Sequence, residues 1–396
     1  MTILGKKEAE ATVRKDKKNR YFDLSTKVLT RKGIRRLKTS QLMELFKKLR
    51  LRISLTPQCN LFCFFCSNEG LSYSAKRDLP ADIDLVIDLC EMLLKTTPLK
   101  SIDFSGGEPT LHPDFLSKEF RIIKFTKRYP HVRFSLHSNG INLSPEIIDQ
   151  IKNHFSRIGI TVNSLNFKKW NRITNAFNQF PESVQKKKFN QMIKNIQYLG
   201  KQNIGYKVFI KSVIMRGIND SEKDLKELMD FCADYHFHPK LLQFEPQHPS
   251  QAKYEVGRAE LFSKLERIGC IFSPDVPFHN NPKTYIPGVN FQYLGKPGAE
   301  PGLHSIFGCG DEGACLACYD FLCMFVKSHS NIKGLYLKPC SVLDTRIDLT
   351  HAIRTKNYKQ LIELFRISRE YLMLAPGLGT KSWNKEESYF TKEACF

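Results

Sequence analysis

The sequence has no long apolar run. None of its 396 residues belongs to a stretch of about 18 apolar residues, the length that a membrane-spanning helix requires. The first residues, Met1–Glu8, contain neither an apolar segment nor a cleavage site, so we expect no secretory signal. Hydrophobic residues make up 41% and charged residues 26%, proportions typical of globular rather than disordered proteins. We therefore expect a globular, cytoplasmic protein without a membrane partner.

Acidic residues are scarce relative to basic ones, with 40 Asp and Glu against 61 Lys and Arg and a net charge of +21. The excess is concentrated in residues 1–50, which contain 16 basic and 5 acidic side chains. Such an arm could bind nucleic acid through its phosphates. We favour instead a solvated leader with a basic helix around Lys38–Arg50, because no aromatic-interleaved RNA-binding motif occurs.

Cysteine, in contrast, is abundant, with 12 residues in a chain that shows no export signal. In a reducing compartment such thiols are more often metal ligands than disulfides. Cys90 and Cys232 lie within apolar helical patterns and are expected in the core. The clustered cysteines are Cys59, Cys63 and Cys66, followed late in the chain by Cys309, Cys315, Cys318, Cys323 and Cys340.

Strand-like and helix-like segments alternate from residue 51 to about residue 246. The expected strands are Leu51–Leu55, Ser101–Ser105, Val132–Leu136, Ile158–Val162, Tyr206–Ile214 and Lys240–Phe244. The expected helices are Asp82–Leu94, Phe115–Lys127, Pro145–Phe155, Ser183–Leu199 and Ser221–Tyr235. Strands separated by helices in this way predict an α/β fold with a parallel sheet and right-handed crossovers.

Beyond Pro246 this alternation ends. Residues 270–310 are rich in Pro, Gly and Asn, and a helical pattern returns only at Tyr358–Tyr371. We expect three parts: a basic N-terminal leader, residues 1–50; a core barrel, residues 51–249; and an irregular C-terminal region, residues 250–396, that closes one side of the barrel.

The strongest chemical signal is the Cys-x3-Cys-x2-Cys loop of Cys59, Cys63 and Cys66, directly after the first expected strand. Three thiolates at this spacing can hold three irons of a cubane [4Fe–4S] cluster and leave the fourth iron open. Zinc is the alternative, but it would need a fourth ligand at suitable spacing. An open iron can bind a small molecule and pass it one electron, so the loop predicts radical chemistry. The phenylalanines between the thiolates would shield the cluster.

A second signal, Gly106-Gly107-Glu108-Pro109, follows the second expected strand. Its two glycines allow the backbone to approach a ligand closely, and Glu108 is expected to lock the turn. The third strand ends in Ser138-Asn139-Gly140. Because ligands bind at the carboxyl ends of parallel strands, we expect these turns to meet the cysteine loop at one edge.

The cysteine loop and the Gly-Gly-Glu-Pro turn together resemble the radical S-adenosylmethionine (SAM) superfamily. The resemblance implies a partial (β/α)6 TIM-like barrel and an oxygen-sensitive enzyme. It also implies that Cys59, Cys63 and Cys66 hold a cluster on which SAM is cleaved to a 5′-deoxyadenosyl radical, with electrons from a partner such as flavodoxin or ferredoxin. The SAM contacts that it implies are Phe65, Gly106, Gly107, Glu108, Ser138, Asn139, Thr161 and Arg216. For Arg216 a surface charge at the end of a strand is an equal alternative.

A narrower resemblance is to the molybdenum-cofactor GTP 3′,8-cyclase family. It rests on Arg52–Thr56, Val213–Asp220 and Gly334–Cys340, and it extends over roughly residues 45–375. That family holds a second [4Fe–4S] cluster with a Cys-x2-Cys-x13-Cys pattern.

The late cysteines fit this second pattern only in part. Cys315 and Cys318 match the first pair, but 21 residues separate Cys318 from Cys340. Either these three hold an auxiliary cluster, or Cys309 or Cys323 completes a site of four thiolates. A zinc site is the other alternative.

The sequence departs from the cyclase family at three places in the region expected to bind substrate. Tyr319–Leu322 replaces arginines that hold nucleotide phosphate in the cyclase family, His112 replaces a basic residue, and the terminal Gly-Gly is absent. We therefore expect an enzyme that acts on another small molecule, in cofactor or natural-product biosynthesis. A maturase of a peptide or protein, an RNA-modifying enzyme, and an electron-transfer or regulatory iron–sulfur protein are the alternatives.

A few residues near strand ends could serve other roles. Glu245 is expected at the mouth of the cavity, where it would meet substrate or form an ion pair. Three histidines also lie near strand ends, and we expect them to be loop residues rather than ligands: His112, His137 and His248.

Overall fold

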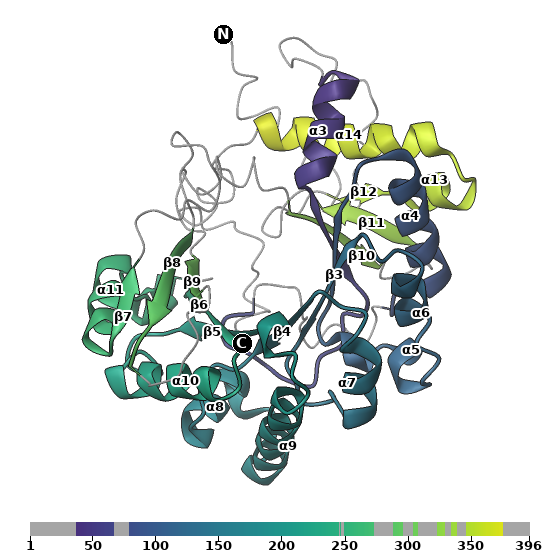
Figure 1. Cartoon of the computed structure of the whole chain (residues 1–396). Helices are drawn as coiled ribbons and strands as arrows, with labels where there is room; N and C mark the ends of the chain where they lie inside the picture. The colour runs from purple at the N-terminus through teal and green to yellow at the C-terminus, as the bar shows by residue number, and fades with distance from the viewer. Residues whose placement is uncertain are drawn as a thin grey trace.

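A curved sheet with helices on its outer side organises the molecule (Figure 1). The computed structural model describes residues 37–66, 79–244, 246, 249–272, 288–295, 304–307, 323–328, 334–338 and 346–374. Within these ranges no helix is both long and apolar enough to cross a membrane.

The centre of the sheet consists of six parallel strands in sequence order. They are β1 Arg50–Ser54, β2 Ser101–Ser105, β3 Arg133–Ser138, β4 Arg157–Thr161, β5 Val208–Ile214 and β6 His238–Gln243. All six predicted strands are present. The described strands form an open sheet that ends in β12 and β7, so the predicted partial barrel is confirmed.

The C-terminal region adds strands to both edges of this centre. The added strands are β7 Cys270–Phe272, β8 Gly288–Tyr293, β9 His304–Phe307, β10 Cys323–Ser328, β11 Leu335–Lys338 and β12 Ile347–Asp348. β10 pairs with β1 and β9 with β6, both in parallel. The region was expected to close one side, whereas its described strands flank two. Which edge a strand joins depends on pairing between segments far apart in the chain, and local periodicity does not reveal it.

Helices cover the outer face of the sheet (Figure 1). The helices between its central strands are α4 Ile83–Thr96, α5 Pro113–Leu116, α6 Arg121–Lys127, α7 Pro145–Ile151, α8 Phe167–Thr174, α9 Glu182–Gly200 and α10 Glu222–Asp234. The later helices are α11 Arg258–Arg267, α13 Thr350–Arg354 and α14 Tyr358–Leu374. Asp82, Ser144 and Ser221 cap α4, α7 and α10 by accepting a backbone N–H, as expected of short polar residues at a helix start.

The predicted helix Phe115–Lys127 is divided into α5 and α6. Lys118 and Phe120 have positive φ angles of 61° and 50°, which interrupt the helix. The buried Asp114 then accepts hydrogen bonds from the backbone of Arg121 (2.9 Å) and Ile122 (3.2 Å), which start the second helix. The apolar pattern continues across the interruption, so periodicity alone did not reveal it.

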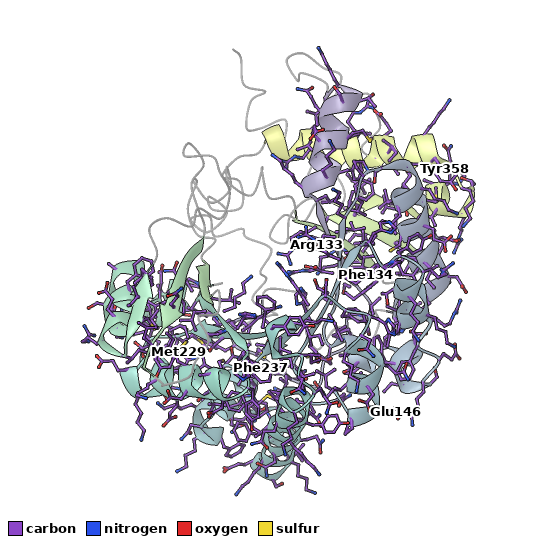
Figure 2. All side chains as sticks on the ribbon, viewed as in Figure 1. Arg133, Phe134, Glu146, Met229, Phe237 and Tyr358 are labelled. Atoms are coloured by element: carbon purple, nitrogen blue, oxygen red, sulfur yellow. The ribbon has the colours of Figure 1, made fainter. Side chains whose placement is uncertain are left out.

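The strands place apolar side chains towards the helices and polar side chains on the opposite, concave face. In β2, Ile102 and Phe104 are fully buried, and Asp103 between them points the other way. Figure 2 labels the neighbours Arg133 and Phe134 of β3, which lie on opposite faces. Phe134 packs against Phe125 of α6, with ring centroids 5.7 Å apart. The concave face is therefore the face on which ionisable groups gather.

The predicted basic helix is present as α3, Thr39–Lys48. It crosses α14 (Figure 1), where the Phe46 and Phe365 rings lie 5.5 Å apart. The backbone N–H of Leu37 also donates to Glu370 of α14 (2.8 Å). The last part of the basic leader is thus packed on the C-terminal helix. The proposed boundaries between the three parts of the chain stay a prediction.

Candidate functional site

The cysteine loop, residues 59–66, is held by backbone hydrogen bonds to the end of α8. The Phe62 N–H donates to the Thr174 carbonyl and the Phe64 N–H to the Ile173 carbonyl, both at 2.8 Å. The loop is therefore attached to the protein between its cysteines. These backbone hydrogen bonds do not involve the thiol side chains, which are therefore left to bind another group.

Helix α8 was not predicted, although the sequence contained signals for it. The Asn166 side chain accepts the Lys169 N–H (3.2 Å), which is the bond of an N-cap residue. Trp170, Ile173 and Thr174 follow at helical spacing and are buried. An N-cap followed by apolar positions three and four residues apart would have identified this short helix.

The Gly-Gly-Glu-Pro turn lies directly against the segment that leads into the cysteine loop. The Gly107 N–H donates to the Thr56 carbonyl and the Glu108 N–H to the Gln58 carbonyl, both at 2.7 Å. A Cβ atom on Gly106, where φ is +151°, would lie 2.5 Å from the Thr56 carbonyl oxygen, and one on Gly107 would collide with Gln58. Both glycines are therefore required by the close approach of two backbones.

Glu108 is fully buried and joins the turn to the end of β3. Its Oε1 accepts hydrogen bonds from the Thr110 N–H (3.2 Å), the Thr110 hydroxyl (2.6 Å) and the Ser138 hydroxyl (2.8 Å). Its Oε2 accepts the Asn139 N–H at 2.7 Å. Burial raises the pKa of Glu108, while these four donors stabilise its charged form. These hydrogen bonds are the ones expected if Glu108 locks the turn.

Asn139 connects this turn with the cysteine loop. Its side-chain amide donates to the Asn60 Oδ1 (2.6 Å) and lies 3.9 Å from the Cys59 sulfur. Lys188 of α9 reaches the same place, because its ammonium donates to the Asn60 carbonyl at 2.7 Å. Burial lowers the pKa of Lys188, and Cys59 acts in the opposite direction. No motif pointed to Lys188, which reaches the loop only through the packing of α9.

Three thiols are a donor set that fits an iron–sulfur cluster. Burial, followed by the charge of Glu108, raises the pKa of Cys59 to about 12, and burial raises the pKa of Cys63 as well. Metal binding is what stabilises such desolvated thiolates. Within the described ranges, no three His, Cys, Asp or Glu side chains form a site for one ion. A cubane gives each thiolate its own iron, so it does not require convergence on one ion.

The other predicted SAM contacts lie near the same edge or at the surface. Phe65 packs against an apolar cluster that includes Met215 and Phe244, and Thr161 is the last residue of β4. Arg216 instead makes a two-point ion pair with Glu260 of α11 (3.1 and 2.6 Å). This is the surface arrangement that was one of its two expected roles. Its part in SAM binding stays a prediction.

Most of the predicted auxiliary site lies outside the described residues. Cys309, Cys315, Cys318 and Cys340 belong to that part of the chain. Cys323 is the first residue of β10, where its Cα pairs with that of Arg50. The ligand set of an auxiliary cluster therefore stays a prediction. Glu245 and His248 also lie outside the described residues.

The histidines within the described residues have two different roles. His112 is a loop residue as expected, and its Nδ1 caps α5 by accepting the Asp114 N–H (3.0 Å). His137, expected in a loop, is instead part of β3. Its Nε2 lies 3.2 Å from Asp103, and its Nδ1 lies 2.6 Å from the Lys211 ammonium nitrogen. Strand β3 continues to Ser138 because β4 pairs along its whole end.

Charged groups surround this contact on the concave face. The Asp103 carboxylate accepts a hydrogen bond from Arg50 (2.7 Å), and Arg52 lies 3.8 Å away. Burial alone would raise the pKa of Asp103, but His137, Arg50 and Arg52 together hold it well below its ordinary value. Sequence reasoning missed this cluster. The signal that could have revealed it is one ionisable residue within each of several otherwise largely apolar strands.

The profile of the radical SAM superfamily matches residues 53–232, which extend from within β1 into α10. This part of the chain is therefore similar to the radical SAM superfamily. The predicted enzyme class and the predicted cofactors, a [4Fe–4S] cluster with SAM, are confirmed at the level of this family.

Curated relatives of the domain are named GTP 3′,8-cyclases. A probable GTP 3′,8-cyclase of Pyrococcus horikoshii is 31% identical over 196 residues, 49% of this chain and 56% of the relative. One of Methanosarcina acetivorans is 25% identical over 340 residues, 85% of this chain and 90% of the relative. The chain thus spans about half the length of the first of these relatives. A solved structure, anSMEcpe with bound AdoMet, has a TM-score of 0.40 at 19% identity over 55% of this chain and 58% of its own.

Proposed function

We propose that this protein cleaves SAM reductively at a [4Fe–4S] cluster held by Cys59, Cys63 and Cys66. The 5′-deoxyadenosyl radical so formed would abstract hydrogen from a small molecule in cofactor or natural-product biosynthesis. The proposal rests on one observation above all. The turn at Gly106–Glu108 is hydrogen-bonded to the residues directly before the cysteine loop, at 2.7 Å in two places.

The residues of the chain divide the work of holding SAM. Cys59, Cys63 and Cys66 would hold three irons of the cluster, and the open fourth iron would supply a binding place for SAM and one electron. Gly106 and Gly107 let the turn pack directly against the backbones of Thr56 and Gln58, which would bring its backbone polar groups beside that position. Glu108 keeps the turn rigid through its hydrogen bonds to Ser138 and Asn139.

The chain also supplies a shielded environment for the electron transfer. Phe64 stacks on Phe244 with ring centroids 5.8 Å apart, and it meets Tyr254 edge to face at 5.2 Å. Phe65 packs against the same apolar cluster. Low polarity around a cluster tunes its reduction potential and limits the access of water. A protein reductant would supply the electron.

The substrate is proposed to differ from GTP, although the named relatives are GTP 3′,8-cyclases. The arginines that the cyclase family carries after its late Cys-x2-Cys pair are replaced by Tyr319–Leu322. Guanidinium groups bind phosphate through paired hydrogen bonds, which Tyr, Phe and Leu side chains cannot replace.

The test is an anaerobic reconstitution of the whole chain with iron and sulfide, followed by dithionite and SAM. We expect 5′-deoxyadenosine and methionine from the unmodified protein and only background from Cys59→Ala. The matched control is Cys90→Ala, since Cys90 is a fully buried cysteine of α4, far from the cluster loop in the chain. Production by Cys59→Ala at the unmodified rate would overturn the proposal.

Iron analysis of the same samples tests the auxiliary cluster. Two cubanes correspond to about 8 iron atoms per chain and one cubane to about 4. We expect the higher value, falling by about half in Cys59→Ala. A value of about 4 in the unmodified chain would contradict the second cluster and leave the first intact.

A further inference from the structure

Three ionisable side chains from three strands form a continuous chain of contacts on the concave face. His137 of β3 stands between Asp103 of β2 and Lys211 of β5. The His137 Nε2 lies 3.2 Å from the Asp103 Oδ2, and the Lys211 Nζ lies 2.6 Å from the His137 Nδ1. We call these three residues the Asp–His–Lys chain.

The sheet is built so that Lys211 can reach His137 across an intervening strand. The residue between them is Gly159 of β4, whose Cα pairs with His137 on one side and Phe209 on the other. A Cβ atom on Gly159 would lie 2.6 Å from the His137 Nδ1 and 2.7 Å from the Lys211 Cε. Any larger residue would therefore separate the two groups.

The contacts determine which nitrogen of His137 carries a proton. Asp103 is held charged by Arg50 and Arg52, so it can only accept a hydrogen bond, and the His137 Nε2 must donate it. The His137 Nδ1 then has a lone pair, which accepts an N–H from Lys211. With one N–H directed at His137, a neutral Lys211 would still have a lone pair that can accept a proton.

The surroundings favour this neutral amine. Burial lowers the pKa of Lys211 well below its ordinary value, and the nearby charges of Arg52, Lys240 and Arg50 lower it further, against the opposing charge of Asp103. Burial, with the same arginines, also lowers the pKa of Lys240 to about 7. A lysine whose pKa is lowered by burial and by nearby positive charges can act as a base or a nucleophile near neutral pH.

The Asp–His–Lys chain lies beside the elements that hold SAM. His137 is followed by Ser138, whose hydroxyl donates to Glu108, and Asp103 lies two residues before the last residue of β2. The residue Lys211 as a whole is half-buried, and its ammonium lies beside His137 on the concave face. A substrate within reach of a radical formed at the cluster edge would therefore also be near Lys211.

We propose that Lys211 is a catalytic acid–base residue for a substrate with an ionisable O–H or N–H group, and that His137 and Asp103 position it. This inference rests on the proposed function, since it needs a substrate on the concave face. In the forward step the Lys211 lone pair takes the proton of the substrate O–H or N–H. The bonding electrons remain on the substrate oxygen or nitrogen, and Lys211 becomes an ammonium that still donates to His137. The reverse step returns the proton to the product.

The test measures the titration of Lys211 directly. Full-length protein is methylated on its lysines with 13C-formaldehyde and cyanoborohydride, and the methyl signals are followed by NMR against pH. Lys211→Arg identifies the Lys211 signal by its loss. The internal control is Lys226 of α10, an exposed lysine whose pKa is raised by hydrogen bonds to Asp230 and Tyr293. We expect Lys211 to titrate at a clearly lower pH than Lys226.

Two substitutions then separate positioning from simple burial. Asp103→Asn removes a nearby negative charge and should lower the titration midpoint of Lys211 further. Arg52→Gln removes a positive charge and should raise it. A Lys211 that titrates with Lys226, that does not react with formaldehyde, or that responds to neither substitution would overturn the inference. An atom that formaldehyde cannot reach is also closed to a substrate.

The titration needs neither cluster nor SAM, so it distinguishes two kinds of failure. If no 5′-deoxyadenosine forms but Lys211 titrates low, the proposed function is wrong and the lysine site remains to be assigned to other chemistry. If 5′-deoxyadenosine forms and Lys211 titrates as an ordinary lysine, the acid–base inference alone is wrong.

Discussion

The concave side of this protein has two regions that are held together by different interactions. At the carboxyl edge, the cysteine loop and the glycine turn are joined mainly by backbone hydrogen bonds and by the buried carboxylate of Glu108. Deeper in the sheet, Asp103, His137 and Lys211 are joined side chain to side chain. Backbone contacts do not depend on the side chains, which suits the edge that we propose to hold SAM, while side chains can be exchanged to suit a substrate.

The largest effect in this comparison is expected from Glu108→Gln. The amide would place a donor against at least one of the N–H and O–H groups that now donate to this buried carboxylate. We expect the free energy of unfolding to fall by about 3 kcal/mol and SAM binding to be lost. Chemical denaturation and SAM titration measure both. Glu119→Gln, an exposed residue, is the control. A stable variant that binds SAM would show that the edge does not depend on this carboxylate.

Gly107→Ala tests the backbone contacts of the edge without altering any charge. Its methyl group would collide with the Gln58 backbone and push the turn from the cysteine loop. We expect SAM affinity to fall at least about tenfold, which corresponds to 1.4 kcal/mol. Calorimetric titration of the reconstituted protein is the measurement. Gly257→Ala is matched to it, because a Cβ atom there meets nothing within 4 Å. Equal affinities in the two variants would contradict the role of the close approach.

Asp103→Asn tests the deeper region through the pH dependence of stability. The folded pKa of Asp103 lies below its unfolded value, so its carboxylate contributes stability above the unfolded pKa. That contribution is lost as the pH falls through the folded pKa. We expect the variant to be less stable than the parent by about 2 kcal/mol at pH 7 and the difference to shrink below about pH 4. Denaturant midpoints across pH provide the check, and a difference that persists unchanged in acid would count against the ion pairs.

The smallest effect is expected from Arg216→Gln, outside both regions. Its guanidinium is exposed and pairs with Glu260 at the surface, where solvent screens the charges. We expect neither SAM affinity nor the denaturation midpoint to change measurably. A marked loss of SAM affinity would show that Arg216 leaves Glu260 to meet SAM, and it would extend the edge region to the end of β5.

Much of the edge was predictable because its residues follow strands with clear apolar patterns. The strand Ser101–Ser105 was placed without error, and the glycine turn follows it directly. Helix α8 and Lys188 were missed, although both hold the cysteine loop. α8 is a short helix between longer elements, and Lys188 is one of several lysines on α9 that the sequence does not distinguish.

The sequence by itself predicted the cluster chemistry, because Cys59, Cys63 and Cys66 are neighbours along the chain at a spacing that suits a [4Fe–4S] cluster. Only the tertiary structure decided that Asp103, His137 and Lys211 meet. The contacts join residues separated by 34 and 74 positions, and they exist because parallel pairing aligns β2 to β5 with Gly159 between the partners. Strand register and the absence of one side chain, neither visible as a motif, brought these groups together.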